Sequence, residues 1–206
     1  MTGPELVRLL DAALERLGGS VDELRDLDAA LGDGDLGITV GKGCDAVREK
    51  LAGLAEPSPG DVLRNAGAAF AGANPSTLAA LVGGGLLAAA RAVGETQEFG
   101  RADALGVGRA AADSIQTRGK AEPGDKTILD ALLPSLDALE RADGDAGAAV
   151  AAMVDAARAG VEETAGLQSQ RGRASWLGER SAGKPDPGAT AYLRFLESVA
   201  AVLATP

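Results

Sequence analysis

The stretch "NAGAAFAGANPSTLAALVGGGLLAAA" runs from Asn65 to Ala90 and contains no charged residue. It is long enough to cross a lipid bilayer. Its middle, however, is Asn74-Pro75-Ser76-Thr77, a sequence that favours a turn followed by a helix N-terminus. Alanine and glycine, rather than large apolar residues, dominate on either side. We therefore predict two buried helices joined by a polar loop, not a membrane span.

The rest of the chain has the same helical character. Apolar residues make up 46% of the 206 residues, mostly Ala and Leu, and aromatic residues only 2%. Ala and Leu favour helices, whereas β-rich domains need Val, Ile, Thr and aromatic residues. Capping boxes at Thr2 and Ser20 and apolar residues at helical spacing predict about eight helices with short loops. The expected fold is an all-α antiparallel bundle in a single domain, residues 1–206. Predicted helices that the structure tests below include one capped by Thr39 and one over residues 190–204.

Charge and composition exclude several classes of function. The formal net charge is −10, and binding to nucleic acid or an anionic membrane needs basic patches. The chain has no histidine, which excludes a His general base, a His-ligated metal and a phosphohistidine. The single cysteine, Cys44, excludes an internal disulfide and favours an intracellular, cytoplasmic setting.

A glycine-rich acidic segment, "LGDGDLGITVGKG" from Leu31 to Gly43, is the candidate for chemistry. It contains Asp33 and Asp35, and Asp28 lies five residues before Asp33. Like charges this close are costly unless positive charge lies among them. The glycines let the three carboxylates converge and let backbone N–H groups approach an anion. Magnesium takes such oxygen ligands and keeps positions open for phosphates. This pattern alone leaves a solvated acidic turn and a metal–phosphate site both open. A calcium EF-hand is disfavoured, because Cys44 stands where its loop needs a glutamate.

Three further segments make the assignment specific. They are "PSTLAALVGG" (75–84), "RGKAEPGDKTILDALLP" (118–134) and "GRASWLGERSAGKPDPGAT" (172–190). Together with the D-x4-D-G-D motif, they closely resemble the L subunit of dihydroxyacetone kinase, the nucleotide-binding subunit, over nearly the whole chain. The resemblance implies a closed barrel of eight antiparallel helices, with a Mg–nucleotide complex in the loops at one end.

The resemblance also implies which residues form the site. Asp28, Asp33 and Asp35 would hold two Mg2+ ions that bridge the phosphates, and no catalytic side chain is implied beyond this metal–nucleotide site. The residues implied to bind ADP or ATP are Leu36, Gly37, Ile38, Thr39, Thr77, Leu78, Gly119, Ile128, Arg173, Asp186, Pro187 and Gly188. Ile128 has core packing as its alternative, Asp125 and Lys126 are interpreted as loop-bracing residues, and Trp176 as a packing anchor.

The implied function is transfer of a phosphoryl group to dihydroxyacetone, or a related small ketose, held by a separate K-type subunit. The nucleotide is either exchangeable ATP or a retained ADP recharged by a phosphocarrier protein of the sugar phosphotransferase system, and a homodimer stays open. The family usually has His where this chain has Leu36, and its small-residue loop differs from the segment at Asn74. These departures leave open an erythrulose-like ketose. A carrier-bound acyl substrate and a nucleotide-state regulator of a transcription factor are further alternatives.

Overall fold

The computed structural model describes residues 1–205 and is all-α over that range. The prediction of an all-α fold is confirmed. The elements are α1 (Gly3–Gly18), α2 (Val21–Ala29), α3 (Leu36–Ala52), α4 (Pro59–Ala73), α5 (Thr77–Val93), α6 (Arg101–Gly119), α7 (Leu129–Arg141), α8 (Ala146–Thr164), the 3-10 segment η1 (Arg173–Ser181) and α9 (Pro187–Leu203).

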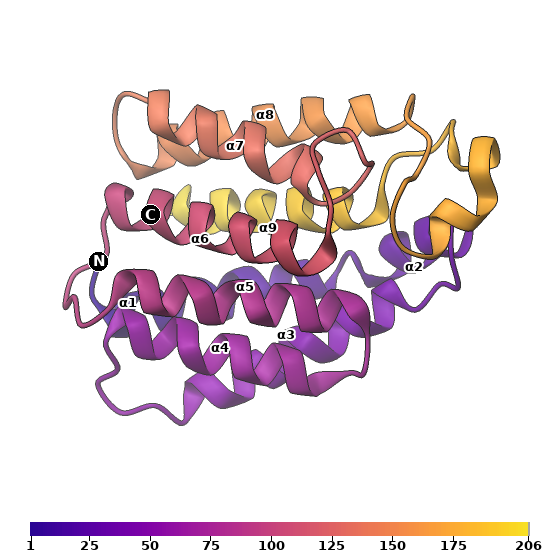
Figure 1. The fold of residues 1–206 in the computed structure, drawn as a ribbon. Helices are drawn as coiled ribbons and strands as arrows, with labels where there is room; N and C mark the ends of the chain where they lie inside the picture. Colours follow the sequence, from indigo (N-terminus) through magenta and orange to yellow (C-terminus); the bar gives the residue numbers. More distant parts are fainter. Residues whose placement is uncertain (206) are drawn as a thin grey trace.

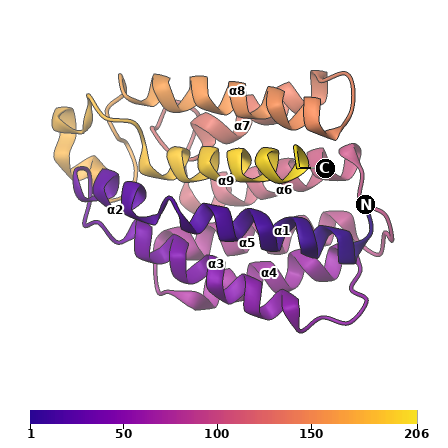
Figure 2. The ribbon, with the colours of Figure 1, turned by 180° about the vertical axis from the view of Figure 1, so that it is seen from behind.

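Eight of these helices form a closed ring. Each of α3 to α9 contacts the next, α9 contacts α1, and α1 contacts α3, which closes the circle. Successive helices of the ring run in opposite directions (Figure 1). Most connections are short, but the one between α8 and α9 is long and contains η1. The short helix α2 lies outside the ring, against α3 and α9, at the same end as η1 (Figure 2). The expected eight-helix antiparallel barrel is therefore present, with α2 as an addition to it.

The apolar core consists of two large clusters, one in each half of the ring, and a small third one around Leu63, Ala89 and Ala90. One cluster is built around Leu129, Leu136 and Leu193 from α7 and α9, and the other around Leu24, Val62 and Leu51. Phe195 packs against both clusters and joins them. Burying apolar side chains on the inner face of each helix is what stabilises such a ring, at roughly 25 cal/mol per Å² of apolar area.

The charge-free stretch that opened the sequence forms α4 and α5, as predicted. Their close approach depends on small residues, because a Cβ added to Gly83 would lie 2.6 Å from the Cβ of Ala71. Ser76 caps α5 by accepting a hydrogen bond from the N–H of Ala79 at 3.1 Å. Within residues 1–205, no helix combines the length and apolar character that a membrane crossing requires.

Two predicted helix starts and one predicted capping box are wrong. The helix after Ser20 begins where it was predicted, with Ser20 as its N-cap residue. Ser20 makes no side-chain cap hydrogen bond, although the capping box at Thr2 is present. Thr39 does not cap α3: the helix begins at Leu36, and the carbonyl of Asp35 already accepts the Thr39 N–H at 2.9 Å. The last helix begins at Pro187 instead of residue 190, because the Asp186 carboxylate caps it and proline suits the first helical position.

Candidate functional site

Four helix N-termini open on one end of the ring. They belong to α3, α5, α7 and α9, and they alternate with the C-termini of α4, α6 and α8 (Figure 1). Helix N-termini carry unpaired N–H groups and a partial positive charge, which favour anions. All the residues predicted to form the site lie at or near this end.

The three aspartates of the D-x4-D-G-D motif converge here. Asp28 lies in the last turn of α2, whereas Asp33 and Asp35 lie in the turn that leads into α3. One carboxylate oxygen from each residue lies within 4.8 Å of the others. Gly34 allows this turn by adopting a φ of 75°, in the left-handed region that favours glycine. The acidic cluster, Asp28 with Asp33 and Asp35, offers the hard oxygen donors that Mg2+ prefers, so the residues present fit that ion.

The three neighbouring carboxylates of the acidic cluster repel one another, so a positive charge among them is stabilising. Burial raises the pKa of Asp28, and the charges of Asp35 and Asp33 raise it further. The N–H of Leu36, which donates to Asp28 Oδ2 at 3.2 Å, lowers this pKa and only partly compensates. Arg173, the first residue of η1, donates to Asp33 and, at 3.4 Å, to Asp35 Oδ2. The hydrogen bond to Asp33 is the main cause of a raised pKa for this guanidinium. The fold thus brings Arg173 to Asp33 and Asp35, although these residues lie far apart in the sequence.

The predicted phosphate-binding residues after the acidic motif form the first turn of α3. Gly37 presses against α2, since a Cβ there would lie 2.3 Å from the carbonyl oxygen of Val21. Ile38 is 49% exposed, whereas Leu36 and Thr39 are buried. The Thr39 hydroxyl accepts a hydrogen bond from Asn74 Nδ2 at 2.8 Å.

That hydrogen bond joins two predicted parts of the site. Asn74 lies three residues before Thr77 and Leu78, which form the first turn of α5. Thr77 is exposed and Leu78 half-buried. The sequence predicts a polar turn at Asn74 and a departure from the family pattern, but not the hydrogen bond to Thr39. The available signal was a short amide side chain beside a proline turn, because its donors and acceptor need partners wherever it is partly buried.

The remaining predicted residues form the other side of this end. Gly119 ends α6 next to Leu81, whose Cδ1 would lie 3.6 Å from an added Cβ. Ile128 immediately precedes α7, packs partly against the core and lies next to Gly188, where an added Cβ would be 3.7 Å from the Ile128 N. Ile128 therefore both packs against the core and lies near the candidate site, so the two interpretations are compatible.

Asp186 is a buried cap. Its Oδ2 accepts the N–H of Ala189 at 2.7 Å at the start of α9, and its own N–H donates to the hydroxyl of Thr164 at 2.8 Å. Burial raises the pKa of Asp186 to about 7, although the hydrogen bond from Ala189 and the charge of Lys126 both lower it. Pro187 and Gly188 follow as the first turn of α9, so the predicted D-P-G segment is a helix N-terminus facing the site end.

Lys126 braces the loop that carries Arg173. Its side chain is 2% exposed, and its ammonium donates to the carbonyls of Leu167, Ser181 and Lys184 at 3.0, 2.6 and 2.6 Å. These carbonyls lie before η1, at its last residue and after it, so one cation draws together the two ends of that segment. Desolvation lowers the pKa of Lys126. The predicted bracing role is confirmed.

Asp125 joins the same loops. Its Oδ2 accepts from Arg171 Nε at 2.7 Å, and its carbonyl accepts the N–H of Gln170 at 3.0 Å. The prediction for Trp176 is wrong: its side chain is 83% exposed instead of anchoring the loop in the core. The anchoring is polar, through Asp125 and Lys126, so an aromatic anchor is not needed.

Known proteins are similar to this chain in both sequence and fold. The DAK2 domain family matches residues 30–201. The chain is 33% identical, over 180 residues, to the PEP-dependent dihydroxyacetone kinase ADP-binding subunit DhaL of Escherichia coli, with 86% of each chain covered. It is 41% identical to the D-erythrulose kinase of Mycolicibacterium smegmatis, where it spans 96% of its own length and 35% of the relative.

Among solved structures, the dihydroxyacetone kinase of C. freundii in complex with AMP-PNP and Mg2+ has the same fold. The TM-score is 0.75 at 22% identity, covering 98% of this chain and 34% of that one. The relatives named above are kinases, and the family match covers most of the chain. The chain therefore belongs to the DAK2 domain family of phosphotransferases and is a DhaL-type subunit within it.

Proposed function

We propose that this chain binds a Mg–nucleotide complex, ADP or ATP, and passes a phosphoryl group to a small ketose held by a separate K-type subunit. The observation that carries the proposal is the acidic cluster, with three carboxylate oxygens within 4.8 Å at an end where four helix N-termini open. The E. coli relative is named an ADP-binding subunit, and the C. freundii structure holds AMP-PNP and Mg2+. Both support this assignment.

Each part of the site has a role in this proposal. Asp28, Asp33 and Asp35 hold the metal, two ions by family resemblance, and bound Mg2+ supplies charge neutralisation of the phosphates. Metal binding supplies the positive charge that Arg173 now provides to Asp33 and Asp35. The guanidinium, 55% exposed, is then free to turn to a phosphate, for which its planar fork is suited.

The first turns of α3, α5 and α9 offer the backbone N–H groups. Leu36 to Thr39, Thr77 with Leu78, and the segment from Asp186 to Gly188 surround the acidic cluster in this proposal. Gly119 and Ile128 lie on the side where the base and ribose would bind. Phosphoryl transfer depends more on such positioning and charge neutralisation than on covalent chemistry by the protein.

A partner protein supplies the acceptor. The chain has no histidine, so it cannot anchor a ketose through one. We therefore assign substrate binding to a K-type subunit, and recharging of a retained ADP to a phosphocarrier protein if the nucleotide does not exchange. Dihydroxyacetone is the first candidate substrate. Erythrulose is the second, because the chain is 41% identical to a D-erythrulose kinase.

Titration calorimetry with Mg2+ and ADP tests the binding proposal. Asp33→Asn and Asp35→Asn should each abolish Mg-dependent nucleotide binding. Asp143→Asn, an exposed acid in the turn after α7 at the opposite end of the ring, is the matched control and should bind as wild type. Wild-type affinity in either site variant would overturn the metal assignment.

The transfer step needs a second assay. Phosphorylation of dihydroxyacetone and erythrulose is measured with a K-type subunit, using either ATP or a phosphocarrier system as donor. ADP released on denaturing the purified protein would favour the phosphocarrier route, whereas turnover of added ATP would favour exchange. If neither ketose is phosphorylated with either donor, the proposed reaction is contradicted. The proposal of nucleotide binding would not be affected by that result.

A further inference from the structure

The helix that carries Asp28 has few anchors of its own. The nine residues of α2 include one buried side chain, Leu24, and Ser20 provides no side-chain cap. A helix this short is not stable in isolation, so its contacts determine where it lies. Asp28 sits in its last turn, and any tilt of α2 therefore displaces one ligand of the acidic cluster.

One side of α2 is fixed by α3. Gly37 lets the two backbones approach, with its added Cβ position 2.3 Å from the Val21 carbonyl oxygen. This contact restrains the distance between the helices. Further contacts come from the same side: an added Cβ would lie 3.3 Å from Val21 Cγ2 at Gly41 and 3.2 Å from Ala29 Cβ at Gly34. All of them come from α3 and the turn before it, so the tilt of α2 also depends on what holds its other side.

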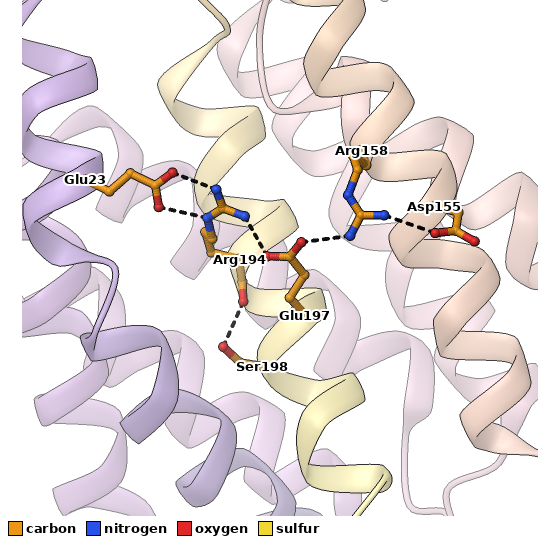
Figure 3. Close-up of polar contacts among 6 residues, drawn as sticks. All are labelled: Glu23, Asp155, Arg158, Arg194, Glu197 and Ser198. Carbon is orange, nitrogen blue, oxygen red and sulfur yellow. Dashed lines mark hydrogen bonds and ion pairs between the residues drawn. The ribbon is translucent and has the colours of Figure 1, made fainter.

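The other side is fixed by an ion pair with α9, shown in Figure 3. Arg194 donates from Nε and Nη2 to the two carboxylate oxygens of Glu23 at 2.8 and 2.6 Å. Two parallel hydrogen bonds fix orientation as well as distance. This fork lowers the pKa of Glu23 and, with Glu197, raises that of Arg194, so the pair stays ionised near neutral pH.

Arg194 is itself held in place. Its Nη1 donates to Glu197 Oε2 at 2.6 Å, and Glu197 Oε1 accepts from Arg158 Nη2 at 2.9 Å. Arg158 in turn pairs with Asp155 at 3.1 Å (Figure 3). The chain of charges thus runs from α8 across α9 to α2. Networks of this kind hold a side chain more firmly than an isolated exposed pair does.

We propose that Arg194 is a positioning residue for the metal site: through Glu23 it holds α2, and with it Asp28, in register with α9. The proposal rests on the proposed function. Since α9 begins at Asp186, the same helix that presents its N-terminus to the nucleotide also sets the place of a metal ligand. Glu23 lies about 7.5 Å along the axis from Asp28, at about 1.5 Å per residue. A pivot of about 10° would then move the carboxylate by roughly 1 Å.

A double-mutant cycle tests this coupling. Glu23→Ala, Arg194→Ala and the double variant are titrated with Mg2+ at saturating ADP, and each metal-free protein is unfolded in urea. We expect each single variant to weaken Mg2+ binding by up to roughly ten-fold, the lower end of what loss of a direct outer partner of a metal ligand costs, because Glu23 acts on Asp28 only through the helix. The double variant should be no weaker than either. Glu23→Gln, which keeps the shape of the side chain, should lie between wild type and Glu23→Ala.

Arg158→Ala is the matched control, because it removes a partner of Glu197 but leaves the fork to Glu23. Its Mg2+ affinity should stay within two-fold of wild type. Wild-type Mg2+ affinity in Glu23→Ala and Arg194→Ala, or additive losses in the double variant, would overturn the positioning role. If the wild-type protein binds no Mg–ADP, the proposed function fails instead, so the two failures are distinguishable.

Discussion

Replacing Lys126 with methionine removes the cation that draws the η1 loop together, with little change in side-chain volume. Three carbonyls, from Leu167, Ser181 and Lys184, lose a charged donor. Each such hydrogen bond is worth about 1.5–3 kcal/mol. This loss of stability is partly offset, because removing the lysine also removes the cost of burying its charge. Each carbonyl left without a partner costs about 1–3 kcal/mol, and after this offset we expect a net loss of about 3–5 kcal/mol in the free energy of unfolding.

Equilibrium unfolding in urea measures this loss. Lys184→Met is the matched control, because it makes the same change at an exposed side chain of the same loop and leaves the Lys184 carbonyl in place. The control should shift the free energy of unfolding by less than about 0.5 kcal/mol. Hydrogen exchange adds a local readout: the Ser169 N–H, which donates to the Ser181 hydroxyl at 2.9 Å, should lose protection in Lys126→Met. A loss below about 1 kcal/mol with unchanged protection would refute the bracing argument.

Three other predictions concern stability. Because the pKa of Asp186 is raised to about 7, the folded protein holds a proton that the unfolded chain releases near pH 4, so this group's contribution to stability falls as pH rises from about 4 to 7. Urea midpoints measured across that range should fall less in Asp186→Asn than in wild type. Gly37→Ala forces a methyl group to within 2.3 Å of the Val21 carbonyl oxygen and should cost about 1–3 kcal/mol in thermal or urea unfolding, whereas Gly72→Ala, with open space around it, should be neutral or stabilising. Trp176→Ser should change the free energy of unfolding by less than about 0.5 kcal/mol, and a larger loss would contradict the exposure of that side chain.

Much of the fold followed from local sequence signals. Helical spacing and the turn at Asn74 predicted α4 and α5, because small apolar residues without charges must be buried on both sides of a polar break. Helix starts were less predictable. Thr39 has the right side chain for a cap, but α3 begins earlier, because the turn at Gly34 lets the chain enter the helix directly at Leu36.

The residues of the candidate site were predictable only through the whole pattern of motifs. The acidic spacing alone left a solvated turn open, and the pairing of Arg173 with Asp33 joins residues far apart in sequence. The anchor between Glu23 and Arg194 had no signal of its own, since single charges on helix surfaces look like any solvated face. Such contacts depend on how the ring closes, which side-chain periodicity does not specify.

The exposure of Trp176 makes the unmodified protein its own optical reporter. It is the single tryptophan of the chain, it lies three residues from Arg173, and it is 83% exposed on η1. Intrinsic fluorescence should therefore change when a ligand or partner covers η1 or when η1 itself moves, for example if Arg173 leaves the acids. For the same reason it will under-report melting of the helical core, because the indole is already in water before unfolding begins.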